Sequence, residues 1–259
     1  MRVIVTVKQI LDPAGITVNR RRERIFVNRE EYIINPIDKL ALEAALRLKD
    51  EHAAEVVAIS LGPARADDAL REALAMGADH AYLLSDDLLA ETDGAGAARA
   101  LARAIEKIGA YDLVLAGQIA DDTGGQEIAG RLAELLSVPQ ILEATKLRLT
   151  DGNALEVVRE WNGKQVVVSA RLPALVAISS KAPAARRSHG ARIMNAYREW
   201  SVTTWTADDL GLTEEDLAPL TESRGLSFPA ERERGNALSG SPADLATDVV
   251  AQWRDRRLV

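Results

Sequence analysis

The residues with the clearest chemical potential lie between Asp112 and Leu136, where an apolar run meets a polar loop and a helix-like segment. Residues 112–116 read DLVLA, residues 117–126 read GQIADDTGGQ, and residues 127–136 read EIAGRLAELL. A loop that joins a strand to a helix N-terminus presents free N–H groups and the positive end of the helix dipole to a ligand. The spacing therefore predicts an anion or nucleotide site.

The two adjacent carboxylates in this loop, Asp121 and Asp122, leave a second interpretation open. They argue against a bare phosphate pocket unless they bind ribose hydroxyls or simply cap the helix. An ordinary capped turn would use Asp121, Asp122 and Thr123 as cap residues. Short glycine-rich loops match nucleotide motifs by chance often enough that the loop alone does not decide between the two.

Composition excludes several classes of chemistry. Hydrophobic residues make up 47% of the 259 residues but aromatic residues only 4%, so the core must be built from Val, Ile, Leu and Ala, as in most parallel sheets. The chain has no cysteine, which excludes disulfides, thiolate catalysis and Cys-ligated metals. Its three histidines are scattered without the spacing of a metal pair, and no nucleophile lies near a base, so we expect no catalytic residue and no metal.

Charge and hydropathy bound the partners and the location. The net charge of −7 argues against general nucleic-acid binding, and we interpret the basic run NRRRER at residues 19–24 as a solvated turn. No apolar run approaches the ~18–20 residues of a membrane span. A strand begins at residue 2, so we expect no signal peptide and a cytoplasmic location.

Strands and helices alternate through the first half of the chain. The expected strands are 2–7, 55–60, 80–84 and 112–116, and the expected helices are 36–50, 66–76 and 94–108, the first with Asn35 as its N-cap. Such alternation implies a parallel sheet that binds ligands at the carboxyl ends of its strands. No GxGxxG follows the first strand and no GxxxxGK[ST] occurs, which argues against a dinucleotide dehydrogenase and a P-loop NTPase.

The second half has a different pattern. Residues 146–149, 155–161 and 165–171 alternate with a period of two around turns at 151–153 and at Asn162-Gly163, which predicts a β-hairpin. A buried strand at 174–179, short helical turns at 208–210 and 214–217, and a polar linker at 227–240 follow. A last amphipathic helix at 243–256 carries Leu245, Val249, Val250 and Trp253 on one side and should dock on its own domain or on a partner.

Several of these stretches together resemble one family. They are INPIDKLALEAALRLKD (34–50), EVVAISLGPARADDALREALAMGAD (55–79), DLVLAGQIADDTGGQEIAGRL (112–132) and VVREWNGKQVVVSARLPALVAIS (157–179), preceded by RVIVTVKQILD (2–12). In this order they resemble the β, or small, subunit of electron-transfer flavoprotein. The resemblance implies an α/β fold of the adenine-nucleotide α-hydrolase-like type, at residues 1–182 with the hairpin. It also implies a partner-recognition loop and linker at 183–240 and a C-terminal arm at 241–259.

The resemblance also implies a function. The chain would pair with a larger α subunit that holds a redox-active FAD, and would carry electrons between flavin dehydrogenases and an acceptor oxidoreductase without being an enzyme itself. Classical members of the family hold one AMP in this chain, whereas bifurcating, NADH-dependent members hold a second FAD there. A stand-alone adenine-nucleotide-binding regulatory module remains a third interpretation.

The family's functional residues fall on defined positions here. Backbone contacts to adenine would come from the end of the first strand, and Thr123 with nearby N–H groups would hold phosphate. The complete nucleotide set is Thr6, Val7, Asn35, Pro36, Ile37, Asp38, Leu61, Gly117, Gln118, Ile119, Ala120, Asp121, Asp122, Thr123 and Gly124. Residues 12–16 would lie near the flavin of the α subunit. Partner recognition would use the loop 183–195, with Gly190, Arg192, Ile193 and Met194.

Three departures from the family's pattern are visible. The loop at 117–124 is shorter by several residues than the usual run. Gly190 stands where the family often has a leucine anchor. The stretch ETDGAGA at 91–97 has the Asp of bifurcating members but lacks the threonines that usually accompany it.

Overall fold

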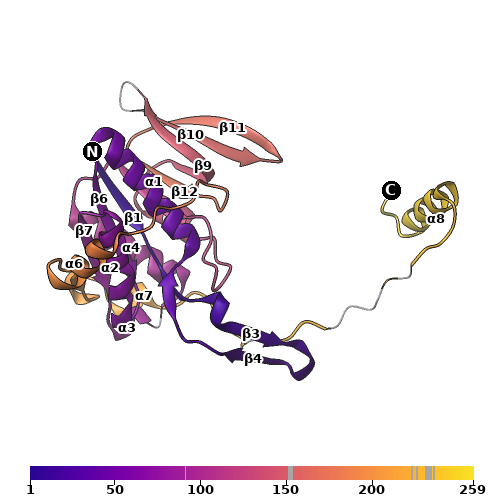
Figure 1. Ribbon diagram of the computed structural model, residues 1–259, viewed down its shortest axis with the longest axis horizontal. Coiled ribbons are helices and arrows are strands. Elements are labelled where there is room, and N and C mark those ends of the chain that lie inside the picture. The colour runs from indigo at the N-terminus through magenta and orange to yellow at the C-terminus, as the bar shows by residue number, and fades with distance from the viewer. Residues whose placement is uncertain (91, 151–153, 223, 226, 231–234, 236) are drawn as a thin grey trace. The chain divides into compact units, whose positions relative to one another are not determined.

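A computed structural model of the chain, shown in Figure 1, describes residues 1–90, 92–150, 154–222, 224–225, 227–230, 235 and 237–259. The chain divides into two compact units, residues 1–223 and residues 224–259. The expected turn at 151–153 and residue 91 of the ETDGAGA stretch lie outside the described residues.

The first unit is built on a nine-stranded sheet with the order β11-β10-β9-β12-β8-β1-β6-β7-β13. All neighbours from β9 to β13 in this order run parallel, and β10 and β11 add an antiparallel hairpin at one edge. The predicted α/β class is therefore confirmed, and the hairpin extends the same sheet. The strands are β1 Arg2–Thr6, β6 Glu55–Leu61, β7 His80–Leu84, β8 Leu113–Gly117, β9 Gln140–Thr150, β10 Ala154–Trp161, β11 Lys164–Arg171, β12 Ala174–Ile178 and β13 Thr203–Trp205.

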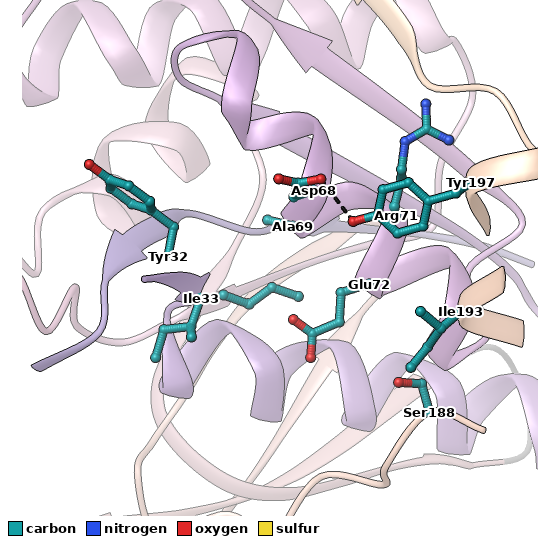
Figure 2. Close-up of a pocket in the computed structure, with 10 residues that line it drawn as sticks. Tyr32, Ile33, Asp68, Ala69, Arg71, Glu72, Ser188, Ile193 and Tyr197 are labelled. Carbon is teal, nitrogen blue, oxygen red and sulfur yellow. Dashed lines mark hydrogen bonds between the residues drawn. The ribbon is translucent and has the colours of Figure 1, made fainter. Parts of the chain in front are cut away.

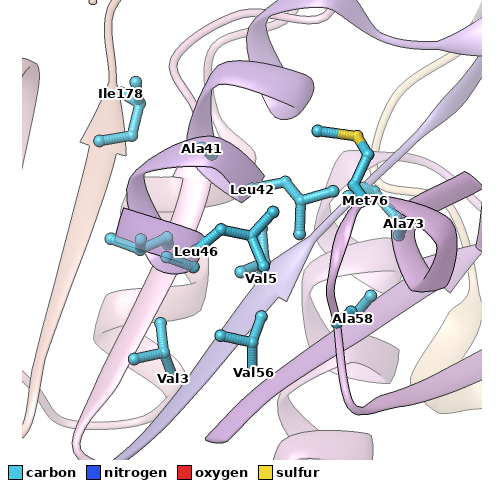
Figure 3. Packing of buried hydrophobic residues seen from close by; sticks show 14 of the residues in the cluster. Val3, Val5, Ala41, Leu42, Leu46, Val56, Ala58, Ala73, Met76 and Ile178 are labelled. Carbon is cyan, nitrogen blue, oxygen red and sulfur yellow. The ribbon is translucent and has the colours of Figure 1, made fainter. Parts of the chain in front are cut away.

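Helices cover both faces of this sheet, and the alternation of side chains along each strand supplies both cores. Val3 and Val5 of β1 point to one face, where they pack with Leu42 and Leu46 of α1 (Figure 3), while Ile4 joins the other cluster. The first face is covered by α1 Pro36–His52, α2 Asp67–Met76 and α6 Gly190–Arg198; the second by α3 Asp87–Ala90, α4 Gly94–Ile108, α5 Ile128–Leu135 and α7 Glu214–Leu217.

Short elements connect the layers. Two small antiparallel sheets precede α1: one joins β2 Gln9–Leu11 to β5 Tyr32–Ile34, and the other joins β3 Ile16–Asn19 to β4 Arg24–Val27. The short 3-10 helices are η1 Pro13–Gly15, η2 Arg20–Arg22, η3 Ala64–Ala66 and η4 Asp208–Leu210. The basic run at 19–24 is the exposed turn of the β3–β4 hairpin, as the sequence predicts.

The structure corrects three expectations about elements. The segment expected to be a loop up to residue 195 contains α6, which begins at Gly190 with the ring of His189 accepting the N–H of Ala191 at 3.3 Å. Strand β9 begins at Gln140 rather than Lys146, because a bulge against β12 and a positive φ of 61° at Glu143 break the period-two pattern there. Strand β13 was not expected at all, since three residues carry no periodicity.

The described residues of the second unit form one helix, α8 Pro242–Asp255, with the side chain of Ser241 accepting the N–H of Asp244 as its N-cap. The helix agrees with the sequence pattern. Within this unit Val250 is 39% exposed and Trp253 is 47% exposed. The apolar side of α8 is therefore largely uncovered by the described residues of its own unit.

The first core gives a test of the fold. Leu42 of α1 is fully buried, whereas Leu135 of α5 is 44% exposed. Leu42→Ala removes packed methyl groups and leaves a cavity, so we expect a loss of about 2–5 kcal/mol in the free energy of unfolding. Leu135→Ala serves as the control and should lose clearly less. Urea denaturation measures both, and equal losses would contradict the assignment of this core.

Candidate functional site

The predicted nucleotide residues converge at the carboxyl edge of the parallel sheet. Strands β1 and β8 are neighbours, so Thr6 and Val7 at the end of β1 lie beside Gly117 at the end of β8. The N–H of Val7 donates to the carbonyl of Ile59 in β6 at 2.9 Å. Strand β6 neighbours β1 on the side opposite β8, and it ends at Leu61. Three adjacent strand ends and the start of α1 thus frame one site.

Asn35 connects the start of α1 to the loop that follows β8. The sequence assigns it the N-cap of α1, but its side chain makes no cap hydrogen bond. Instead its Nδ2 donates to the carbonyl of Ile119 at 2.9 Å and its Oδ1 accepts the N–H of Asp121 at 3.1 Å. Asn35 is 1% exposed. A buried amide with both groups used holds the loop against the helix start.

Asp38, in the first turn of α1, connects the two strand ends. Its Oδ2 accepts the N–H of Lys8 at 2.8 Å and its Oδ1 accepts the N–H of Gly117 at 3.1 Å. Burial raises the pKa of Asp38 to about 7, although these N–H donors and the side chain of Asn35 act in the opposite direction. A Cβ at Gly117 would stand 2.1 Å from Oδ1 of Asp38, so only glycine allows this approach.

The loop itself is a compact turn. The N–H of Gly124 donates to the carbonyl of Ala120 at 2.7 Å, the N–H of Ala120 donates to the carbonyl of Gly125 at 3.0 Å, and Gly124 has a φ of 70°. Buried Gln118 fixes the start of the loop, because its N–H donates to the carbonyl of Ile178 and its Oε1 accepts the N–H of Glu143. The loop is thereby tied to β12 and β9.

The capped-turn interpretation of this loop is wrong. Helix α5 begins at Ile128 with Glu127 at the N-cap position, and no side chain caps it. Asp121, Asp122 and Thr123 lie too early in the chain, and the side chain of Thr123 accepts the N–H of Gly125 instead. Among the described residues, the backbone N–H groups of Asp122, Thr123 and Gln126 donate to no protein group. The loop therefore presents free donors.

The ETDGAGA stretch has a structural role as far as it is described. Asp93 is the N-cap of α4, and its Oδ1 accepts the N–H groups of Ala95 and Gly96. Its Oδ2 accepts the N–H groups of Leu220 and Thr221, which follow α7. Asp93 therefore joins two distant segments on the second face of the sheet.

The predicted recognition residues divide into two groups. Arg192 points toward the body of the protein, where its guanidinium donates to the carbonyls of Leu74 and Ala75 at the end of α2. Ile193 and Met194 are 43% and 52% exposed. At Gly190 an added Cβ would meet nothing within 4 Å. Ile193 and Met194 therefore form an exposed apolar surface on α6.

Sequence inspection missed the anchor of the segment that leads into α6. Glu43 of α1 is buried, and its Oε2 accepts the backbone N–H and the Nε of Arg186 at 3.0 and 2.8 Å. Burial alone would raise the pKa of Glu43, but these hydrogen bonds and one from Arg47 hold it below its usual range. The sequence signal that could have revealed this contact is a glutamate beside the apolar positions of α1, because a buried charge needs a partner.

A pocket of about 350 Å³ lies between β5, α2 and α6 (Figure 2). Tyr32, Glu72 and Ile193 line it, and the hydroxyl of Tyr197 donates to Asp68 at 2.8 Å across it. Burial and this hydrogen bond raise the pKa of Tyr197 to about 12. The pocket is separate from the strand-end site and shares Ile193 with the exposed surface of α6.

Within the described residues, no group of three or more His, Asp or Glu side chains could hold a metal ion. In the same residues, no helix combines the length and the apolar character needed to cross a lipid bilayer.

The mostly parallel sheet with helices on both faces defines an α/β protein, and the predicted site residues meet at the carboxyl ends of its strands. Residues 24–210 match the electron transfer flavoprotein domain. Over the full length of both chains, 32% of residues are identical to the electron transfer flavoprotein subunit beta of Thermoanaerobacterium thermosaccharolyticum, and 32% to CarD, a subunit of the caffeyl-CoA reductase–Etf complex of Acetobacterium woodii. The subunit beta of Bacillus subtilis is 35% identical over 88% of both chains. This chain belongs to the electron-transfer flavoprotein family, as a β subunit.

Asp38 makes the stability of the fold depend on pH. An aspartate in the unfolded chain has a pKa of about 3.9, so the folded chain binds this proton more tightly. Between about pH 4 and 7 the free energy of unfolding should therefore fall as the pH rises, by up to about 1.4 kcal/mol per unit. Urea denaturation at pH 5 and 7 measures the fall. Asp38→Asn should remove most of it, and Asp87→Asn, at an exposed aspartate, should leave it unchanged. An equal fall in all three proteins would contradict the role of Asp38.

Proposed function

We propose that this β subunit holds an adenine nucleotide at the carboxyl edge of its sheet and, with an α subunit, supports an FAD that passes electrons from flavin dehydrogenases to an acceptor oxidoreductase. The observation that carries the proposal is the pair of contacts from Asn35 and Asp38. From one helix start they hold a loop with free N–H donors beside the end of β1. Such backbone donors suit a phosphate group.

The residues around this edge fit an adenine nucleotide in chemical terms. The backbone of Thr6 and Val7 would face the adenine, Leu61 would flank it, and Thr123 with the neighbouring N–H groups would hold the phosphate. AMP is the ligand that we assign first. The flavin, when bound, supplies the electron transfer, and the chain supplies orientation and exclusion of water.

A second FAD in place of AMP is the alternative that one observation favours. CarD, at 32% identity over the whole chain, is named as part of a reductase–Etf complex. A second FAD would extend beyond the phosphate loop, whereas AMP would fill only the strand ends. Nucleotide content separates the two assignments.

Exposed apolar residues on α6 and α8 supply the two partner surfaces of this proposal. Ile193 and Met194 on α6 are the residues that we assign to flavin dehydrogenases, since both are apolar and exposed. Trp253 and Val250 on α8 are assigned to the α subunit. An amphipathic helix with an uncovered apolar side commonly binds in a groove of a partner.

Release and quantification of the nucleotides test the site. We expect one FAD and one AMP per heterodimer co-purified with its α subunit. Asn35→Ala should lower the AMP content severalfold, because two backbone groups of the loop lose a buried partner. Asn28→Ala, at an exposed asparagine that bonds Thr17, is the control. Two FAD per heterodimer would support bifurcation, and a full AMP content in Asn35→Ala would contradict the proposed site.

Amide hydrogen exchange tests the assignment of α8. A 14-residue helix is marginal in water without packing, so its amides should exchange rapidly in the chain alone and become protected in the heterodimer. The amides of β1 and β8 should be protected in both samples. Equal protection of α8 with and without the α subunit would contradict its role in subunit binding.

A further inference from the structure

The strand-end site carries an unfavourable balance of charge for a phosphate. Among residues 6–8, 35–38, 61 and 117–125 the only cation is Lys8, whereas Asp38, Asp121 and Asp122 are acidic. Asp38 is buried and used by two backbone N–H groups. The nearest charges to an incoming phosphate are therefore Lys8 and the two loop carboxylates.

Lys8 is fixed at its backbone and reaches across to the loop. Its N–H donates to Asp38 at 2.8 Å, and its carbonyl accepts the N–H of Asn35 at 2.8 Å. Its Nζ lies 2.6 Å from Oδ2 and 2.8 Å from Oδ1 of Asp122. The side chain of the site's one lysine is thus occupied by a carboxylate of the loop that would bind phosphate.

This ion pair is of a kind that an anion of higher charge can displace. The side chains of Lys8 and Asp122 are 41% and 31% exposed, and partly exposed ion pairs contribute little to stability. A phosphate monoester carries a charge of about −1.5 to −2 at pH 7 and three acceptor oxygens. In the described part of the chain, the neighbouring N–H groups of Asp122, Thr123 and Gln126 have no protein acceptor and are free to donate to the phosphate.

We propose that Lys8 is the phosphate-binding cation of this site and that Asp122 competes with the nucleotide phosphate for its ammonium group. The inference rests on the proposed function, which supplies the nucleotide. When the phosphate binds, the ammonium group of Lys8 exchanges one carboxylate for one phosphate, and the carboxylate of Asp122 turns toward solvent. No covalent bond changes. Asp122 thereby sets the affinity of the shortened loop.

Equilibrium dialysis of the heterodimer, after removal of its resident nucleotides, tests this exchange with AMP, FAD and adenosine as probes. Lys8→Met should weaken AMP binding about tenfold, the loss expected for one charge-assisted hydrogen bond. Lys8→Arg should stay close to wild type. Asp122→Asn should tighten AMP binding about threefold or more, and less so in combination with Lys8→Met.

Adenosine separates a phosphate contact from a structural effect. It lacks the phosphate, so its affinity should be the same in all variants, while FAD should follow AMP if its diphosphate occupies the loop. Lys39→Met, at a lysine that pairs with Glu72 on α2, is the matched control and should change nothing.

Two failures are distinguishable. A wild-type heterodimer that binds neither AMP nor FAD at this chain would overturn the nucleotide site and the inference with it. If the wild type binds AMP but Lys8→Met loses affinity for AMP and adenosine equally, the competition alone is overturned and the nucleotide site stands. The same conclusion follows if Asp122→Asn gains no affinity for AMP.

Discussion

The site depends on the hydrogen bonds that the buried carboxylate of Asp38 accepts from two strand ends. Its oxygens take the N–H of Lys8 after β1 and the N–H of Gly117 at the end of β8. The pairing between β1 and β8 ends at Val5 and Leu115, so without Asp38 these two partly buried donors would lose their protein partner. One side chain near the start of α1 therefore joins the ends of both strands, from which the site residues continue.

The sequence was sufficient for the parallel sheet because its signals are local and strong. Continuous apolar runs such as that of β12, alternating with helices that start at Asn35-Pro36 and end before Gly77, leave few other folds. The Asn162-Gly163 turn was equally clear, and both residues have positive φ values, 49° and 71°. Resemblance to a family then supplied the site residues.

Other parts of the site were not readable from the sequence because distant contacts decide them. Asn35 has the residue type and position of an N-cap, yet its amide bonds Ile119 and Asp121, more than 80 residues away. Helix α6 was expected to be a loop. It is held against α2 by two arginines: Arg71 of α2 donates to the carbonyl of Trp200 just after α6, and Arg192 of α6 donates to carbonyls at the end of α2. Local propensity cannot register such partners.

The same contacts limit what the residues at the strand ends can do. The polar groups at the strand ends are nearly all committed to backbone partners: Asn35 to the loop, Asp38 to two strands, Gln118 to β9. Groups used in this way can position a ligand but cannot exchange protons with it without breaking the frame. What remains at the edge is a set of loop N–H groups and one lysine that is paired with Asp122, and such groups suit an anion. Under the proposed function this is sufficient, because a bound flavin supplies the electron-transfer chemistry and the protein contributes binding and orientation.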